Sequence, residues 1–213
     1  MTCGKKRLLF VKATKDYNEP VISHISSVCK LLDVEFIEYD FKTLSVFEND
    51  CKDLGKFDFV YIAAHGNHAC FGENAPLNHT RWADFGVSLC TTEIMNSGSV
   101  LFLGCCNGGL KRVAMILFCN CPQITAVCGP KWKVTGHDVA VAIHCFLYNL
   151  LISGEEPIVV AERTSLAVGY SFPIYDRYEL ESEIAIMQWA RGFQAVPDDY
   201  NTSEPAINAN ATE

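Results

Sequence analysis

Residues 57–66 (FDFVYIAAHG) and 99–109 (SVLFLGCCNGG) are the two stretches that indicate the fold class most clearly. Each begins as a nearly continuous apolar run of strand length and ends in glycine and polar residues. Such runs are typical of a parallel sheet covered on both faces, because a strand with one solvated face alternates apolar and polar side chains. The two stretches therefore predict central strands of an α/β protein.

Further strand-like runs flank these two and alternate with segments of helical period. We expect strands at 7–13, 34–39 and 123–128. Apolar side chains recur at helical spacing in the intervening segments 21–32, 44–54, 110–118, 137–152 and 156–168. Strands that alternate with helices, joined by right-handed crossovers, predict a three-layer α/β/α sandwich with a mainly parallel sheet.

Length, composition and charge limit the domain organisation and the partners. The chain has 213 residues, of which 49% are apolar, and a formal net charge of −8. We expect one domain at 1–196 and a disordered tail at 197–213, which is polar and poor in large apolar side chains. The acidic balance disfavours nucleic acid as a partner. No apolar run reaches the ~20 residues of a membrane helix and no secretion signal is evident, so we expect no membrane association and a cytoplasmic location.

Eleven cysteines raise the possibility of disulfides or bound zinc. Their odd number, the lack of an export signal and their frequent position inside apolar runs argue against a disulfide scaffold. The pairs Cys105-Cys106 and Cys119-Asn120-Cys121 lack the C-x₂₋₄-C spacing of structural zinc sites. We therefore expect no metal, and most of these thiols are predicted to be small buried side chains.

The candidate site lies where the two central strands end. Ligands of open parallel sheets bind outside the carboxyl ends of the strands, and His65 follows one predicted strand while Cys106 follows the next. A cysteine with a histidine is the minimal pair of a thiol hydrolase. We favour Cys106 over Cys105 as the nucleophile, because alternation turns one of them toward a helix layer and Cys106 begins the glycine-containing loop. Packing by the cysteines and loop capping by His65 are the simpler interpretations of each residue alone, and their joint occurrence favours catalysis.

These residues resemble the caspase-like cysteine peptidases, and most closely their CHAT branch. That family has His-Gly after one strand and x-Cys-x-x-Gly after a strand one α/β unit later, which correspond here to His65-Gly66 and to 105–109. The family continues with a strand and a Trp-x-Val turn into a helix, which correspond to 124–128 and to 132–138 (WKVTGHD). The resemblance covers residues 57–168.

The resemblance implies a cysteine endopeptidase with a Cys106/His65 dyad. The thiolate of Cys106 attacks the scissile carbonyl, and His65 protonates the leaving amine and later activates water. The N–H groups of Gly66 and Cys106 would form the oxyanion hole. No cofactor is implied. The implied partners are a protein or peptide substrate and a regulatory protein, as in defence-associated and death-associated relatives.

The same resemblance bears on the substrate residue before the cleaved bond, P1. Caspases use a glutamine two residues before the nucleophile to bind an acidic P1 side chain, and Gly104 stands there in this chain. Separase-like enzymes bind basic P1 residues with an acid near the Trp-x-Val turn, which implies a substrate site at Trp132 and Asp138. Residues Thr135 to Asp138 also have the form of a helix capping box, and for Asp138 we favour this capping role over substrate binding. The expected P1 residue is Arg or Lys rather than Asp, with a small apolar residue as the alternative.

Two other functions remain open. Cys106 and Arg112 have the C-x₅-R spacing of cysteine phosphatases, in which N–H groups at a helix start and the arginine hold phosphate. The second alternative is a catalytically inactive caspase-like domain that serves as a binding module.

Overall fold

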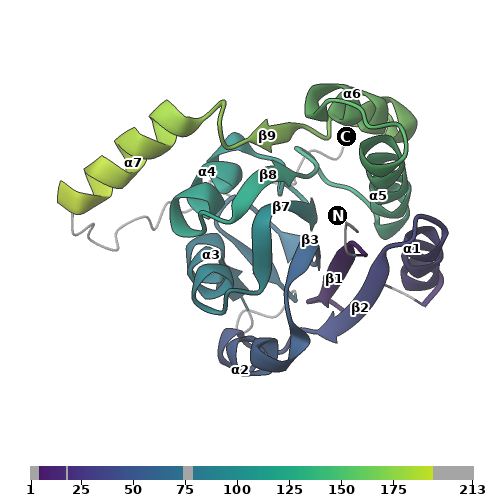
Figure 1. Ribbon diagram of the computed structural model, residues 1–213, viewed down its shortest axis with the longest axis horizontal. Coiled ribbons are helices and arrows are strands. Elements are labelled where there is room, and N and C mark those ends of the chain that lie inside the picture. The colour runs from purple at the N-terminus through teal and green to yellow at the C-terminus, as the bar shows by residue number, and fades with distance from the viewer. Residues whose placement is uncertain (1–4, 18, 74–78, 194–213) are drawn as a thin grey trace, which may run out of the picture.

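A six-stranded sheet between two layers of helices forms the body of the protein (Figure 1). The computed structural model describes residues 5–17, 19–73 and 79–193. The strand order is β2-β1-β3-β7-β8-β9. The first five strands of this order are parallel to one another: β1 (Arg7–Lys12), β2 (Glu35–Asp40), β3 (Phe57–Ala63), β7 (Met95–Gly104) and β8 (Ile124–Cys128). The edge strand β9 (Ile174–Asp176) is antiparallel to β8.

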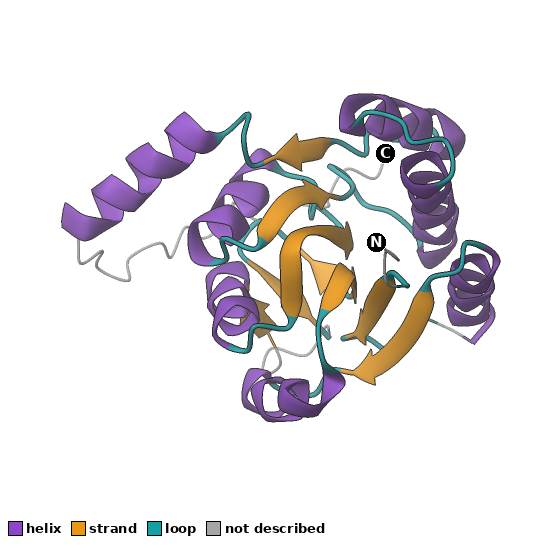
Figure 2. Cartoon of the chain, viewed as in Figure 1, coloured by secondary structure: helices purple, strands orange, loops and turns teal. Residues whose placement is uncertain are grey.

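Helices of the described residues cover both faces of this sheet (Figure 2). On one face lie α2 (Leu44–Leu54), α3 (Trp82–Thr91) and α4 (Lys111–Asn120). On the other lie α1 (Glu19–Leu31), α5 (Gly136–Leu151) and α6 (Pro157–Val168). A seventh described helix, α7 (Glu181–Phe193), extends outward beyond β9 and α4 (Figure 1). These findings confirm the predicted three-layer α/β/α sandwich with a mainly parallel sheet.

The apolar strands supply both cores, which explains why their sequences show so little alternation. In β1, Leu9 and Val11 face the α2–α3–α4 layer, whereas Leu8 and Phe10 face the α1–α5–α6 layer. Successive side chains of a strand point to opposite faces, so the part of a strand that is covered on both faces is apolar at successive positions. Each large side chain that is fully buried contributes about 1.5–3 kcal/mol relative to an exposed one.

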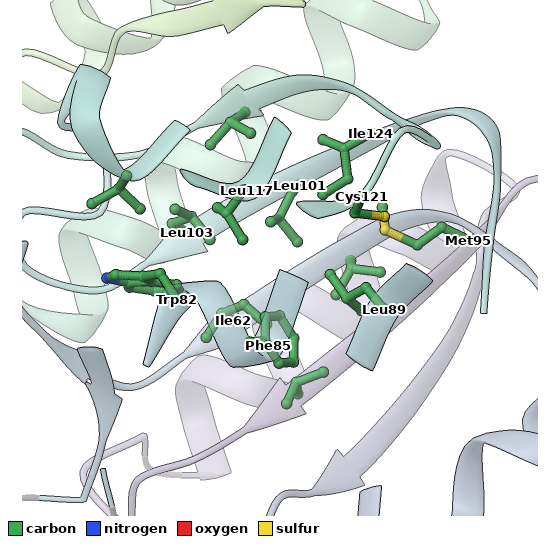
Figure 3. Close-up of a cluster of buried hydrophobic side chains, with 14 of the residues drawn as sticks. Ile62, Trp82, Phe85, Leu89, Met95, Leu101, Leu103, Leu117, Cys121 and Ile124 are labelled. Atoms are coloured by element: carbon green, nitrogen blue, oxygen red, sulfur yellow. The ribbon is translucent and has the colours of Figure 1, made fainter. Parts of the chain in front are cut away.

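The core under α3 and α4 is shown in Figure 3. There Trp82, Phe85 and Leu89 of α3 gather against the sheet, and Leu117 reaches it from α4. On the opposite face the ring of Tyr61 is stacked between two other rings, with centroid distances of 4.8 Å to Phe10 and 5.4 Å to Phe102. Rigid packing on both faces therefore holds the strands that lead to the candidate site.

Several elements were not predicted. A small antiparallel sheet is formed by β4 (His65–Gly66), β5 (Cys70–Gly72) and β6 (His79–Arg81). Strands of two or three residues are too short to show a period, which explains this omission. Helices α3 and α7 and the short strand β9 were also missed, and β7 begins four residues earlier than expected. The predicted tail at 197–213 lies outside the described residues. No helix in the described ranges is long and apolar enough to span a membrane.

Candidate active site

The ends of the central strands lie in one row, and this register places the candidate residues. Lys12 of β1 is paired with Ala63 of β3, and Ala63 is paired with Gly104 of β7. His65 and Cys106 each follow this row by two residues, so both emerge at the same edge of the sheet. They line one cavity of about 260 Å³. Its other walls are the loop after β1, the strand-end residues Ala64, Gly104 and Cys105, and residues 134–136, which lead into α5.

The two adjacent cysteines have different environments. Cys105 is 1% exposed and belongs to the core under α3 and α4. Burial, together with the neighbouring Cys106, raises the pKa of the Cys105 thiol far above its ordinary value. Cys106 is half-buried and its Sγ lies 3.9 Å from the carbonyl oxygen of Val134. Cys105 thus packs toward a helix layer although it also lines the cavity, and Cys106 is the more accessible of the two thiols.

The imidazole of His65 is held by a carboxylate that the sequence analysis did not identify. Nε2 of His65 lies 2.8 Å from Oδ2 of Asp16, in the loop after β1. The neighbouring Tyr17 is buried, and its hydroxyl donates to the carbonyl oxygen of Gly104 at 2.6 Å. The sequence carried only a partial signal, the position of Asp16 after a predicted strand; that β1 lies next to β3, so that its loop opens beside His65, is seen only in the structure.

Three successive backbone N–H groups of the loop after β7 donate hydrogen bonds to carbonyl oxygens of the protein. Asn107 has a φ of 61°, and its N–H donates to the carbonyl of Trp132 at 3.4 Å. The N–H groups of Gly108 and Gly109 donate to the carbonyls of Cys105 and Pro130, at 3.1 and 2.8 Å. These three N–H groups are therefore already hydrogen-bonded within the protein. They are not the predicted oxyanion donors, which are the N–H groups of Gly66 and Cys106.

Gly66 lies directly against this loop. A Cβ at Gly66 would come within 2.8 Å of the Sγ of Cys105 and 3.1 Å of the carbonyl oxygen of Cys106. The absence of a side chain therefore lets β4 approach the end of β7. This contact brings together the backbones of Gly66 and Cys106, the two residues whose N–H groups are the predicted oxyanion donors.

The three predicted substrate-binding residues are placed differently. Gly104 lines the cavity. Trp132 is 66% exposed and lies outside the residues that line it. Asp138 also lies outside them, and its Oδ2 accepts from the N–H and the hydroxyl of Thr135 at 2.9 and 2.8 Å. Since the hydroxyl of Thr135 in turn accepts from the N–H of Asp138, the pair forms a complete capping box at the start of α5.

Other groups considered from the sequence do not converge on this cavity. Arg112 lines a separate depression between α4 and α7, together with Lys111 and Glu183. The C-x₅-R spacing therefore does not bring the guanidinium to Cys106. In the described part of the chain, no group of three or more His, Cys, Asp or Glu side chains is arranged to hold a metal ion. No disulfide joins the described cysteines.

No protein-family model matches the chain, and a comparison with curated proteins finds no match. The chemistry of the protein must accordingly be inferred from the cavity that His65, Cys106 and the loop after β1 form together.

Proposed function

We propose that this chain is a cysteine endopeptidase that cleaves protein or peptide substrates with Cys106 and His65. The observation that carries this proposal is that both side chains line one cavity at the carboxyl ends of adjacent parallel strands. A half-buried cysteine and a histidine that line one cavity supply the minimal groups for acyl transfer through a thioester. The resemblance of residues 57–168 to the CHAT branch of caspase-like peptidases supports the same chemistry.

The proposed reaction has two steps. The Cys106 thiolate attacks the scissile carbonyl carbon, and the N–H groups of Gly66 and Cys106 hold the oxyanion. Protonated His65 then donates its proton to the leaving amine, which breaks the peptide bond and leaves a thioester on Cys106. In the second step neutral His65 takes a proton from water, whose oxygen attacks the thioester; the C–S bond breaks, the carboxylic acid leaves, and the Cys106 thiolate and protonated His65 are restored.

The first test is covalent labelling with an iodoacetamide probe and a peptidyl acyloxymethyl ketone, combined with cleavage of a peptide library. Cys106→Ala should lose the ketone label and peptide cleavage, and His65→Ala should lower cleavage by about 10²–10⁴-fold because the general acid is gone. Cys105→Ala is the matched control and should retain most activity. A dead Cys105→Ala beside an active Cys106→Ala would reassign the nucleophile.

The same experiment separates the alternatives. Turnover of p-nitrophenyl phosphate that depends on Cys106, without peptide cleavage, would indicate a phosphatase, although the position of Arg112 away from the cavity speaks against it. A folded wild-type protein whose Cys106 takes no ketone label and cleaves no peptide would indicate a binding module.

We further propose Arg or Lys at P1. Gly104 has no side chain that could act as the glutamine of caspases does, and the acidic chain attracts basic peptides. Oδ2 of Asp138 accepts from both the N–H and the hydroxyl of Thr135, which is a helix-capping role. The P1 preference should therefore survive Asp138→Asn. A fluorogenic library with all residues at P1 measures this, and a preference for Asp would refute it.

A regulatory protein partner is proposed as well. An unrestrained peptidase would damage its own cell, and the resemblance to defence-associated and death-associated peptidases implies an activating or restraining partner. The purified chain should therefore cleave few unrelated proteins until that partner is added. Broad activity of the purified chain on many unrelated proteins would contradict this expectation.

A further inference from the structure

The ring of His65 has two nitrogens, and the structure shows which of them is engaged by Asp16. The Oδ2 of Asp16 lies 2.8 Å from Nε2. An ionised carboxylate only accepts hydrogen bonds, so this contact requires a proton on Nε2. In the neutral ring Nδ1 is then the bare nitrogen, and it is the one that is left to accept a proton in the cavity shared with Cys106.

The loop that carries Asp16 is anchored to the ends of β3 and β7, the strands that His65 and Cys106 follow. On one side of Asp16, the N–H of Ala13 donates to the carbonyl of Ala63, the last residue of β3, at 2.8 Å. On the other side, the buried hydroxyl of Tyr17 donates to the carbonyl of Gly104, the last residue of β7, at 2.6 Å. The position of the carboxylate is therefore set by the same strand ends that position the dyad.

Within the loop, the N–H of Asp16 donates to the hydroxyl oxygen of Thr14 at 3.2 Å. The hydroxyl of Tyr61 donates to that of Tyr17 at 3.2 Å, which extends the anchor into the core. Two short bonds to the strands and a local turn leave the backbone at Asp16 little freedom. This arrangement is what a residue that orients a catalytic imidazole requires.

We propose that Asp16 is the positioning residue of the dyad: it holds the ring of His65 by Nε2–H, so that Nδ1 receives the proton of the Cys106 thiol. The proposal rests on the proposed peptidase function. In this step the S–H bond of Cys106 breaks and an N–H bond forms at Nδ1, giving a thiolate and an imidazolium. Asp16 stays ionised and stabilises the imidazolium through the Nε2–H bond.

Solvent exposure limits the size of the effect. The side chains of His65 and Asp16 are 32% and 67% exposed, so water partly screens their interaction. We therefore expect Asp16→Ala and Asp16→Asn to lower kcat by about 10- to 100-fold, less than the ~10⁴-fold loss seen for a buried acid in a serine protease triad. KM should stay within about two-fold, because the carboxylate acts on the ring rather than on the substrate.

The kinetic test compares Asp16→Ala, Asp16→Asn and Asp16→Glu with Asp40→Asn, an exposed carboxylate at the end of β2 that serves as the charge-matched control. Asp16→Glu should recover part of the kcat lost in Asp16→Ala, whereas Asp40→Asn should keep wild-type kinetics. The substrates are one peptide with Arg at P1 and one with Ala at P1. A rise in KM confined to the Arg peptide, with kcat unchanged, would show that Asp16 binds substrate and would overturn the proposal.

A second readout does not depend on peptide cleavage. In ¹⁵N-labelled protein the Nε2–H proton of His65 should exchange slowly with water and be visible, because it is hydrogen-bonded to Asp16. It should broaden beyond detection in Asp16→Ala and persist in Asp40→Asn. An equally sharp signal in Asp16→Ala would overturn the positioning role. If the wild type cleaves no peptide while this signal depends on Asp16, the peptidase function fails and the Asp16–His65 interaction stands.

Discussion

Gly104 shows how the lack of one side chain shapes the floor of the candidate active site. A Cβ at this position would lie 2.5 Å from the hydroxyl oxygen of Tyr61 and 2.9 Å from the carbonyl oxygen of Ile62. Tyr61 has no room to withdraw, because its buried ring is stacked between Phe10 and Phe102. The glycine is therefore required by packing at the end of β7, whatever the substrate that binds above it.

We predict that Gly104→Ala lowers the free energy of unfolding by about 1–3 kcal/mol, the usual cost of overpacking a core. Gly136→Ala is the control, since the nearest atom to its Cβ would be Cγ2 of Val21 at 3.9 Å and it stands at the start of α5. That variant should be neutral or gain up to about 1 kcal/mol from helix propensity. Urea unfolding monitored by tryptophan fluorescence measures both, and equal stabilities for the two variants would contradict the packing argument.

The carboxylate of Asp58 connects β3 to its two neighbouring strands, β1 and β7, near their amino ends. Asp58 of β3 accepts hydrogen bonds from the N–H of Arg7 at 2.9 Å, from Nζ of Lys6 at 3.0 Å and from Nδ2 of Asn96 at 3.3 Å. Burial alone would raise the pKa of Asp58, but these donors outweigh it and hold the pKa below its usual value. The ionised form therefore stabilises the native state.

A lowered pKa in the folded protein fixes the sign of the pH dependence. The contribution of Asp58 is present above the unfolded pKa of about 4 and is lost as the pH falls through the native pKa. We predict that Asp58→Asn lowers the free energy of unfolding by about 1–3 kcal/mol at pH 7. The difference from the wild type should shrink as the pH falls below about 4, where the wild type also loses the charge.

Asp33→Asn is the matched control for this measurement. Asp33 also pairs with a lysine, Lys5 at 2.8 Å, but its side chain is 86% exposed. Exposed pairs contribute little, so a change of less than about 1 kcal/mol is expected at pH 7. Urea titrations at a series of pH values measure all three proteins. A constant difference between wild type and Asp58→Asn from pH 7 to pH 2 would show that the charge of Asp58 does not matter.

Arg177, which directly follows the edge strand β9, connects this edge of the sheet to the end of α4 and the start of β8. Its Nη2 donates to the carbonyls of Phe118 and Cys121 at 2.7 and 2.6 Å, and its Nε donates to the carbonyl of Ile124 at 2.7 Å. The guanidinium also lies over the ring of Phe118, 5.0 Å from its centroid. Partial burial lowers the pKa of Arg177, yet arginine remains charged in proteins.

We predict that Arg177→Met, which keeps the apolar stem, lowers the free energy of unfolding by about 2–5 kcal/mol, because three partly buried carbonyls lose a charged donor. Arg177→Lys should recover only part of this, since one ammonium group lacks the planar fork of the guanidinium. Arg81→Met, at an exposed pair with Asp84, is the control and should change stability by less than about 1 kcal/mol. Thermal and urea unfolding measure these changes, and a fully stable Arg177→Met would show that this connection is dispensable.

The layers of the molecule, and the strand ends where chemistry was expected, follow from local patterns of residues along the chain. A strand buried on both faces is apolar along most of its length, so β1, β3, β7 and β8 were readable without knowledge of their neighbours. The capping box of Thr135 and Asp138 was readable for a similar reason, because it joins residues three apart in one turn. Local patterns such as these need no information from distant parts of the chain.

Which groups from distant parts of the chain meet depends on the order of the strands in the folded sheet. The strand order β2-β1-β3-β7 brings the loop after β1 to the end of β3, and so it places Asp16 on His65. No pattern of neighbouring residues encodes that order. The same holds for Arg112. Its spacing from Cys106 suggested a phosphate site, but in the folded protein this residue lies between α4 and α7, outside the cavity that Cys106 lines. Contacts between segments far apart in the chain depend on how the whole sheet is assembled. The apolar faces of a strand show that it is buried, but they do not specify which strand lies beside it.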